Sequence, residues 1–298
     1  MMTKHIFRAV FALMLGVFAS GCYDQDAAVD LPTYKKRTAI TCYLSPKDPN
    51  ITVELGYTKP YFGPQDSEIP RVGDAKVVIT DLTAGKSVQI PFDSSIMLYR
   101  IRAFALPIVN EHEYRVDVTL KDGSAFFAKT VVPPALKETD LKVGQYRIGK
   151  LETNNWGGQS VNVAVELKSG TTKTGYFYAP KFEMVMEDGL GDFYGSELFF
   201  SNAGIAEGKS ADTLRYFFND KIFMDMGPGG GTPTDPLILH EVAGAFWVMD
   251  EAYKERYLRD LQVTDNPFAE PVLLYSNWNN DAVGALGSYD WVEAVITP

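Results

Sequence analysis

The sequence predicts a mainly β protein with two antiparallel β domains, and three observations support this prediction. Apolar and polar residues alternate with a period of two along most of the chain, which is the pattern of strands with one buried face. Clusters of Gly, Pro, Asn, Asp and Ser separate these runs, as expected of turns between short strands. Only residues 250–261 show a convincing helical period, so helices contribute little to the predicted fold.

Residues 1–21 are typical of a cleaved targeting segment. Lys4 and Arg8 give a positively charged start, and the apolar run Ala9–Phe18 is too short to span a bilayer as a permanent helix. The Ala-Ser-Gly triplet at residues 19–21 resembles a bacterial lipobox, although leucine is more usual at its first position. We therefore expect cleavage before Cys22 and lipid on its thiol. The alternative is an ordinary secretory signal followed by a chance cysteine.

Residues 22–36 are expected to form a polar tether behind the lipidated cysteine. Asp24 and Asp26 lie directly after Cys22, and acidic residues at this place resemble the surface-export signal of Bacteroidota lipoproteins. A generic solvated linker is the alternative. Several acyl chains anchor a protein stably, whereas a single chain binds marginally. These residues predict an outer-membrane protein that is held by lipid and faces the cell exterior.

The charge of the chain argues against nucleic acid as a partner. The 298 residues include 38 acidic and 28 basic ones, and removal of Lys4 and Arg8 with the targeting segment gives a net charge of −12. Such a chain offers no basic surface to phosphates and is repelled by anionic headgroups, so lipid must hold it at the membrane. Cys42 is the one cysteine besides Cys22, so no intrachain disulfide is expected; it lies in a strand pattern and is predicted to be buried.

The first predicted domain covers residues 37–134 and resembles an immunoglobulin or fibronectin sandwich. Its strands are predicted at Thr38–Leu44, Ile51–Thr58, Ala75–Thr80, Leu98–Ala103, Tyr114–Leu120 and Ala125–Val132. The pair Asp122-Gly123 is a strong hairpin signal between the last two. Two consecutive prolines, Pro133 and Pro134, end this pattern and mark the predicted boundary.

The second predicted domain covers residues 135–298 and has longer strands, which favour a larger curved sandwich or barrel with one short helix. Its strands are predicted at Lys142–Ile148, Ser160–Leu167, Gly175–Met186, Phe193–Phe200, Thr213–Phe223 and Leu237–Val248. Asp250 is the expected N-cap of the helix, whose apolar stripe contains Tyr253, Tyr257, Leu258 and Leu261.

The motifs that carry chemistry in enzymes are incomplete here. The glycine-rich stretch Gly227–Thr232 is followed by Pro233 and Pro236 and has no lysine after its glycines, so it is better interpreted as a hairpin loop than as a phosphate-binding loop. His240-Glu241 lacks a second histidine four residues later. The acidic turn Glu187–Asp192 does not follow the ligand pattern of a calcium loop and is better interpreted as a hairpin turn. We therefore expect a noncatalytic protein without a cofactor or a metal site.

Two tryptophan loops are candidate ligand contacts. Trp156 and Trp278 lie among asparagine and glycine residues, so Trp156, Trp278, Asn277 and Asn279 offer rings and amides to a sugar. Tryptophans in β domains are more often core or rim residues, which is the competing interpretation. Thr213, in the sequence Asp-Thr-Leu, matches a short O-glycosylation pattern of Bacteroidota, or is simply a strand residue.

Several stretches resemble a Bacteroidota lipoprotein family catalogued as domain of unknown function 4249. They are Asn266–Asn277, Gly284–Tyr289, Val72–Asp81, Tyr114–Val118 and Ala128–Pro134. They occur in the expected order from about Arg37 onward. The run Trp278–Asp281 departs from the more glycine-rich family pattern, so the resemblance implies no function for this loop.

This resemblance implies a noncatalytic accessory protein of a TonB-dependent outer-membrane β-barrel receptor. Such a lipoprotein is expected on the extracellular mouth of the receptor, where it helps to capture or retain cargo. The alternative is a freestanding glycan-binding or adhesive protein of the cell surface, for which the loops of Trp156 and Trp278 are the motivation. A shared fold does not define a ligand, so both remain hypotheses.

Overall fold

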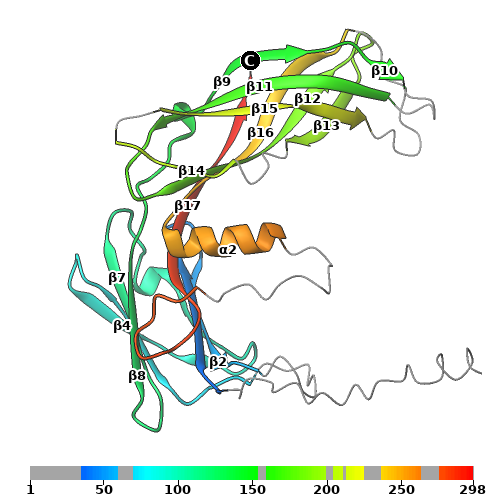
Figure 1. Ribbon diagram of the computed structural model, residues 1–298. Helices are drawn as coiled ribbons and strands as arrows, with labels where there is room; N and C mark the ends of the chain where they lie inside the picture. The colour runs from blue at the N-terminus through cyan, green and yellow to red at the C-terminus, as the bar shows by residue number, and fades with distance from the viewer. Residues whose placement is uncertain are drawn as a thin grey trace, which may run out of the picture. The chain divides into compact units, whose positions relative to one another are not determined.

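The computed structural model describes residues 35–59, 70–153, 159–198, 204–210, 213–224, 236–262 and 275–297 (Figure 1). Most of these residues lie in β-strands. Residues 36–298 belong to one compact unit. Within the described ranges the strands form three sheets, in which one pair of strands is parallel and the others are antiparallel. The prediction of a mainly β protein is therefore confirmed.

The first half of this unit is built from eight short strands around one core. They are β1 (Thr38–Leu44), β2 (Asn50–Tyr57), β3 (Lys76–Asp81), β4 (Lys86–Ile90), β5 (Phe92–Asp93), β6 (Leu98–Arg102), β7 (Glu113–Thr119) and β8 (Ala125–Val131). These strands form two layers. In one layer the strand order is β4-β3-β7-β8, and in the other it is β1-β2-β6-β5. Alternate residues of both layers are buried in the same core, for example Ile40 and Val53 opposite Val77 and Val116.

The second half has longer strands and a core of its own. They are β9 (Lys142–Ile148), β10 (Glu152–Thr153), β11 (Gln159–Thr171), β12 (Phe177–Glu187), β13 (Phe193–Leu198), β14 (Ala206–Glu207), β15 (Thr213–Met224), β16 (Ile238–Met249) and β17 (Leu286–Ile296). β11 pairs with β9, β10 and β15, and β12 pairs with β13, β14 and β16. Val163 of β11 and Met184 of β12 are buried in the same core. These described strands do not close into a barrel, so the sandwich alternative is the one consistent with the structure.

β17 connects the two halves into a nine-stranded sheet. Its first residues pair in parallel with β1, with Cys42 opposite Leu286, and its later residues pair with β16, with Trp247 opposite Trp291. Among the described strands, eight follow the order β13-β12-β16-β17-β1-β2-β6-β5, and the ninth, β14, pairs with β12 beside this path. The hydrogen bonds of one strand thus run from the first half of the unit to the second.

The predicted strands correspond closely to those observed. β1 and β9 have the predicted bounds, and the ends of the other predicted strands differ by a few residues. The hairpin at Gly123 is also confirmed, with φ of 89° at this glycine, and Cys42 is buried at 1 % exposure. The acidic turn Glu187–Asp192 joins the antiparallel strands β12 and β13, as expected. The sequence did not predict β4, β5, β10, β14 or β17.

Short helical segments interrupt the strands at three described places. The α-helix α2 covers Glu251–Gln262, and two 3-10 turns cover Ala103–Ala105 and Glu138–Asp140. Asp250 caps α2 as predicted, because its Oδ1 accepts a hydrogen bond of 2.8 Å from the backbone N–H of Tyr253. α2 packs against β16 and β17.

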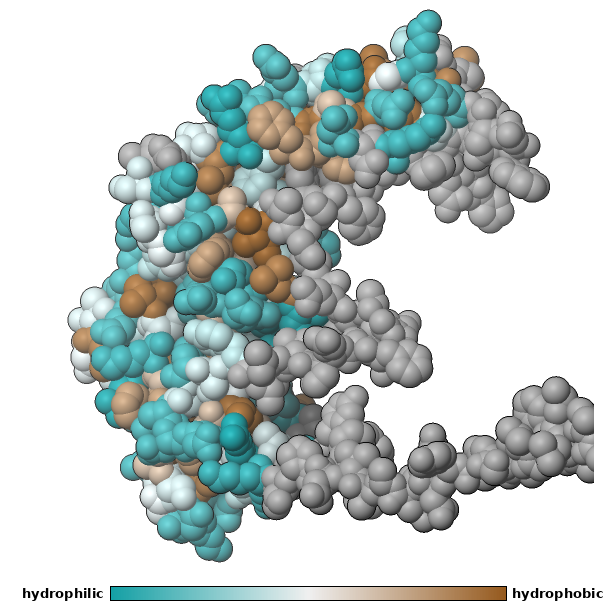
Figure 2. All heavy atoms as spheres, viewed as in Figure 1, coloured by the Kyte–Doolittle hydropathy of each residue, from teal (hydrophilic) through white to brown (hydrophobic). Residues whose placement is uncertain are grey.

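The visible surface of the described residues is mainly hydrophilic, with smaller apolar patches between the polar ones (Figure 2). This agrees with the acidic composition of the chain. Within the described ranges, no helix combines the length and apolar character required to cross a bilayer.

Candidate functional site

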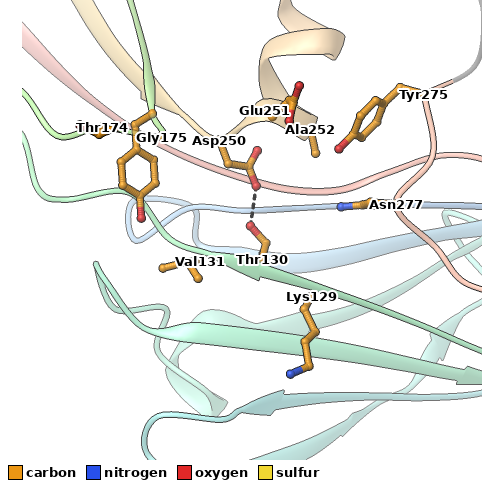
Figure 3. Close-up of a pocket in the computed structure, with 11 residues that line it drawn as sticks. Lys129, Thr130, Val131, Thr174, Gly175, Asp250, Glu251, Ala252, Tyr275 and Asn277 are labelled. Atoms are coloured by element: carbon orange, nitrogen blue, oxygen red, sulfur yellow. Dashed lines mark hydrogen bonds between the residues drawn. The ribbon is translucent and has the colours of Figure 1, made fainter. Parts of the chain in front are cut away.

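A pocket of about 430 Å³ lies beside the start of α2, where four segments far apart in the sequence meet (Figure 3). Residues 129–131 of β8 form one wall, and residues 174–176, before β12, form another. The remaining lining comes from residues 250–252 and from the pair Tyr275 and Asn277. Its volume lies within the range of about 300–1,000 Å³ that small-ligand pockets have, and it is open to solvent.

Asp250 connects three elements at this pocket. Its Oδ2 accepts hydrogen bonds from the hydroxyl of Thr130 on β8, at 2.5 Å, and from the backbone N–H of Ser288 on β17, at 3.0 Å. Its Oδ1 caps α2 through the N–H of Tyr253. The Thr130 contact is the dashed line in Figure 3. The same carboxylate therefore holds β8, β17 and the helix in a fixed arrangement.

Asp250 is stabilised by hydrogen bonds alone in the described part of the chain, where no Lys, Arg or His forms an ion pair with it. Burial raises the pKa of the Asp250 carboxyl above its ordinary value, and the hydrogen bonds from Thr130, Tyr253 and Ser288 oppose this rise. A buried carboxylate without a counter-charge is costly, and a cation in the pocket would stabilise its ionised form.

Two partly buried tyrosines face an acidic environment in the pocket. Burial raises the pKa of Tyr275, and the charges of Glu251, Asp250 and Glu255 raise it further. The pKa of Tyr176 is raised by burial and then by the nearby carboxylates of Glu111 and Asp250. Burial is the larger cause of both shifts, and the nearby carboxylates add a negative contribution to the potential at each phenol.

Two lysines near the pocket form ion pairs with glutamates, one of which, Glu251, lines the pocket. Lys129 Nζ lies 3.1 Å from Glu113 Oε1, and its ammonium group points away from the other labelled residues in Figure 3. Lys254 Nζ lies 3.1 Å from Glu255 and 4.0 Å from Glu251. These cations offset part of the acidic charge, but neither they nor any other described Lys, Arg or His forms an ion pair with the carboxylate of Asp250.

The arrangement in the pocket suits noncovalent binding. It brings together aromatic rings, carboxylates and the backbone of a strand, which are contacts for a ligand with a positive charge. Neither His112, whose Nδ1 lies 2.9 Å from Asp81, nor His240 lines it. In the residues that the structure describes, no group of three His, Cys, Asp or Glu side chains is placed to hold a metal ion.

Of the predicted ligand contacts within the described ranges, Asn277 is the one that lines this pocket. Its side-chain amide is occupied on both sides by Leu286, donating to the carbonyl oxygen at 2.7 Å and accepting from the N–H at 2.9 Å. Asn279 Oδ1 accepts from the N–H of Phe127 at 2.6 Å. Both amides therefore fix the backbone of their own chain.

Trp278 lies in the first hydrophobic core with 7 % of its surface exposed, so its ring packs inside the protein. Thr213 is an exposed residue at the start of β15. Ligand contact by Trp278, Asn277 and Asn279 and glycosylation of Thr213 remain predictions, to which these positions add no support. Cys22, Asp24, Asp26, Trp156 and the glycine-rich loop of residues 227–235 lie outside the described residues.

The sequence did not identify Lys129, Tyr176 or Tyr275 as site residues. Asp250 was predicted as a helix cap, which it is, but not as part of a pocket. No local motif marks these residues, because the pocket depends on tertiary contacts among four separate segments.

Comparison with known families gives one match. The model of a family described as "Domain of unknown function (DUF4249)" matches residues 25–294, which is most of the chain. The matched region includes every residue of the pocket. The search of curated proteins found no match.

Proposed function

The chain belongs to the DUF4249 family, and from this premise we propose that it is a lipid-anchored protein of the outer cell surface that serves a TonB-dependent receptor as a noncatalytic accessory. In this proposal the acylated Cys22 holds the protein at the outer membrane. The pocket beside α2 contacts cargo that the receptor imports.

The position of Cys22 carries the proposal. It follows the apolar run and the lipobox-like triplet, and the family match begins three residues later, at residue 25. A short acidic tether therefore precedes the folded domain, as an anchored protein requires. The acidic composition adds support, because it gives the protein no electrostatic attraction to a lipid surface.

Protease treatment of intact cells tests the location. We expect added protease to digest the wild-type protein and Cys22→Ala to be released from the membrane or mislocalised. Cys42→Ala is the matched control, because Cys42 is buried in the core and its loss should leave the anchor intact. Digestion only after cell lysis would place the protein on the periplasmic face and contradict the proposal.

The export signal is tested separately. Joint replacement Asp24→Asn and Asp26→Asn should reduce the fraction that protease reaches in intact cells, while the protein stays in the membrane. Asp30→Asn removes a charge further along the same tether and should have no effect. Equal exposure of all three forms would show that the aspartates are an ordinary linker.

Receptor partnership is tested by purification of the protein from gently solubilised outer membranes. A β-barrel receptor should be recovered with the wild-type protein and lost with Cys22→Ala, which no longer shares the membrane. Repeated recovery of the protein without any receptor would contradict the accessory role.

A further inference from the structure

β8 is an edge strand whose free side is covered by hydrogen bonds at both ends. It pairs with β7 on one side and, among the strands that the structure describes, with no other strand on the opposite side. On the other side, the N–H of Phe127 donates to Asn279 Oδ1 at 2.6 Å, and Phe127 O accepts from the N–H of Asn279 at 3.2 Å. Four residues further along, Ser288 Oγ donates to Val131 O at 3.0 Å.

The residue between these two contacts is Lys129, whose backbone has no hydrogen-bond partner among the described residues. Residues two apart in a strand direct their N–H and C=O groups to the same side. Lys129 therefore presents both groups to the edge that Phe127 and Val131 use. Among the described residues, neither group has a hydrogen-bond partner on this side, although each of its neighbours on this edge has one.

We call the N–H and C=O of Lys129 an unpaired rung of the β8 edge. This rung borders the pocket, because Lys129 is one of the lining residues. An unpaired donor and acceptor on an edge strand fit one kind of occupant best, a further stretch of extended main chain. One residue of such a segment supplies the C=O and the N–H that Lys129 lacks. The covered positions on either side limit the pairing to about one rung, so a short segment suffices.

The carboxylates around this rung favour a bound segment with a positively charged side chain. The carboxylate of Asp250 has no cationic partner in the described part of the chain, and Glu251 adds a second, exposed carboxylate. Tyr176 and Tyr275 supply aromatic surface beside them. The start of a helix by itself favours an anion, but here Asp250 caps α2 and Glu251 occupies its first turn, which reverses the sign.

We propose that this pocket binds a short extended peptide segment that carries a lysine or arginine. The main chain of the segment pairs with the backbone of Lys129, and its positive side chain lies beside Asp250 and Glu251, between the two tyrosines. The inference names the cargo chemistry of the pocket and so rests on the proposed function only in taking the pocket as a binding site.

Calorimetric titration of the purified full-length protein in detergent tests both halves of the proposal. The probe is acetyl-Val-Lys-Val-amide. Acetyl-Val-Glu-Val-amide, which reverses the charge, should bind at least about tenfold more weakly. The same lysine peptide with an N-methylated lysine cannot donate its main-chain hydrogen bond and should bind about fivefold more weakly.

Variants of the protein test the same two contacts from the other side. Lys129→Pro removes the free N–H, which an edge position tolerates because this N–H makes no bond to β7. Lys129→Ala is the matched control, since it removes the same side chain and keeps the N–H. We expect affinity for the lysine peptide to fall about fivefold in the proline variant relative to the alanine variant. Glu251→Gln should weaken the lysine peptide about threefold and leave the glutamate peptide no weaker.

Three results would overturn the proposal. One is no binding of the lysine peptide at about 10 mM, which corresponds to negligible affinity. Another is equal binding of the lysine and glutamate peptides. The third is equal binding of the lysine peptide, its N-methylated form and free lysine amide, which would make the occupant a simple amine. If Lys129→Pro does not fold, the N-methylated peptide still decides the main-chain contact. The titration contains no receptor, so it tests peptide binding alone. A negative titration is therefore distinguishable from a negative receptor pull-down, which tests the accessory role.

Discussion

At the scale of single residues, Gly284 shows how closely the last part of the chain approaches β1. Its φ is +104°, and a Cβ at this position would overlap the carbonyl oxygen of Ile40. Gly284→Ala should therefore lower the free energy of unfolding by about 3 kcal/mol, from left-handed backbone strain together with the backbone clash. Urea denaturation of the purified variant measures this loss.

Gly85→Ala is the matched control for this substitution. Gly85 also has a positive φ, +66°, but no atom lies within 4 Å of the position of its Cβ. Only the backbone strain applies there, so we expect a loss of about 1 kcal/mol. Equal losses at the two sites would show that the close approach of Gly284 to Ile40 adds nothing to the cost of a side chain at this position.

The lowered pKa of Asp81 predicts how the free energy of unfolding depends on pH. Burial alone would raise the pKa of this carboxyl, but hydrogen bonds from His112 and from the N–H of Ala84 outweigh it and hold the pKa below the ordinary value of 3.8. A carboxyl with a lowered pKa in the folded state stabilises the protein above its unfolded pKa, and this contribution is lost as pH falls through the folded value. Asp81→Asn should therefore be less stable than the wild type at pH 6.

The same comparison at acidic pH provides the test. The difference in unfolding free energy between wild type and Asp81→Asn should shrink as pH is lowered from 6 through the range near and below 3.8, because the wild-type carboxyl is then protonated in both states. A difference that stays constant with pH would mean that the carboxylate charge of Asp81 contributes nothing to stability.

At the scale of elements, the position of α2 depends on aromatic packing. The ring of Tyr253 stacks on Tyr289 of β17 with centroids 4.1 Å apart, and meets Tyr43 of β1 edge-on at 5.3 Å. Tyr253→Ala should lower the free energy of unfolding by about 2 kcal/mol, since a partly buried ring is lost together with its ring contacts. Tyr253→Phe keeps the ring and should cost less than about 1 kcal/mol. Urea denaturation distinguishes them, and a similar loss in both variants would assign the effect to the hydroxyl.

Alternation of residues predicted the strands that have one buried face, and it failed where that condition is not met. β7 shows the successful case, with Tyr114, Val116 and Val118 buried and the residues between them facing outward. β17 shows the failure, because Ser288 and Asp290 are polar and yet buried, hydrogen-bonded to Thr130 and Asn110. A strand that buries both faces has no period of two to detect.

The candidate site was less predictable than the strands. Asn277 was named from its local sequence and does line the pocket, but its amide serves the backbone of Leu286. Tyr176 and Tyr275 are 99 positions apart in the numbering and carry no motif, so only the fold brings them to one pocket. Asp250 was predictable as the N-cap of α2, whereas its hydrogen bond with Thr130 on β8 was not.

At the scale of the whole molecule, β17 and the segment before it make the first core depend on residues far away in the sequence. The sequence places a domain boundary at residue 134, yet the first core also contains Trp278, Ala282 and Leu286. β1 takes its parallel neighbour from β17, and Asn279 covers the edge of β8. Burial of Trp278 and Leu286 alone is worth roughly 2–3 kcal/mol each, a large share of the 5–15 kcal/mol that stabilises a typical domain.

The boundary is testable with two fragments. Residues 36–134 alone should show no cooperative unfolding transition in urea, because they lack these three core residues and β17, the parallel partner of β1. A longer fragment, in which a Gly/Ser linker of about 12 residues joins residue 134 to residues 275–290, restores both and should unfold cooperatively. Near-ultraviolet circular dichroism provides an independent measure of packing in each. If the short fragment unfolds as cooperatively as the longer one, residue 134 ends an independent domain, and β17 adds contacts that the first half does not need.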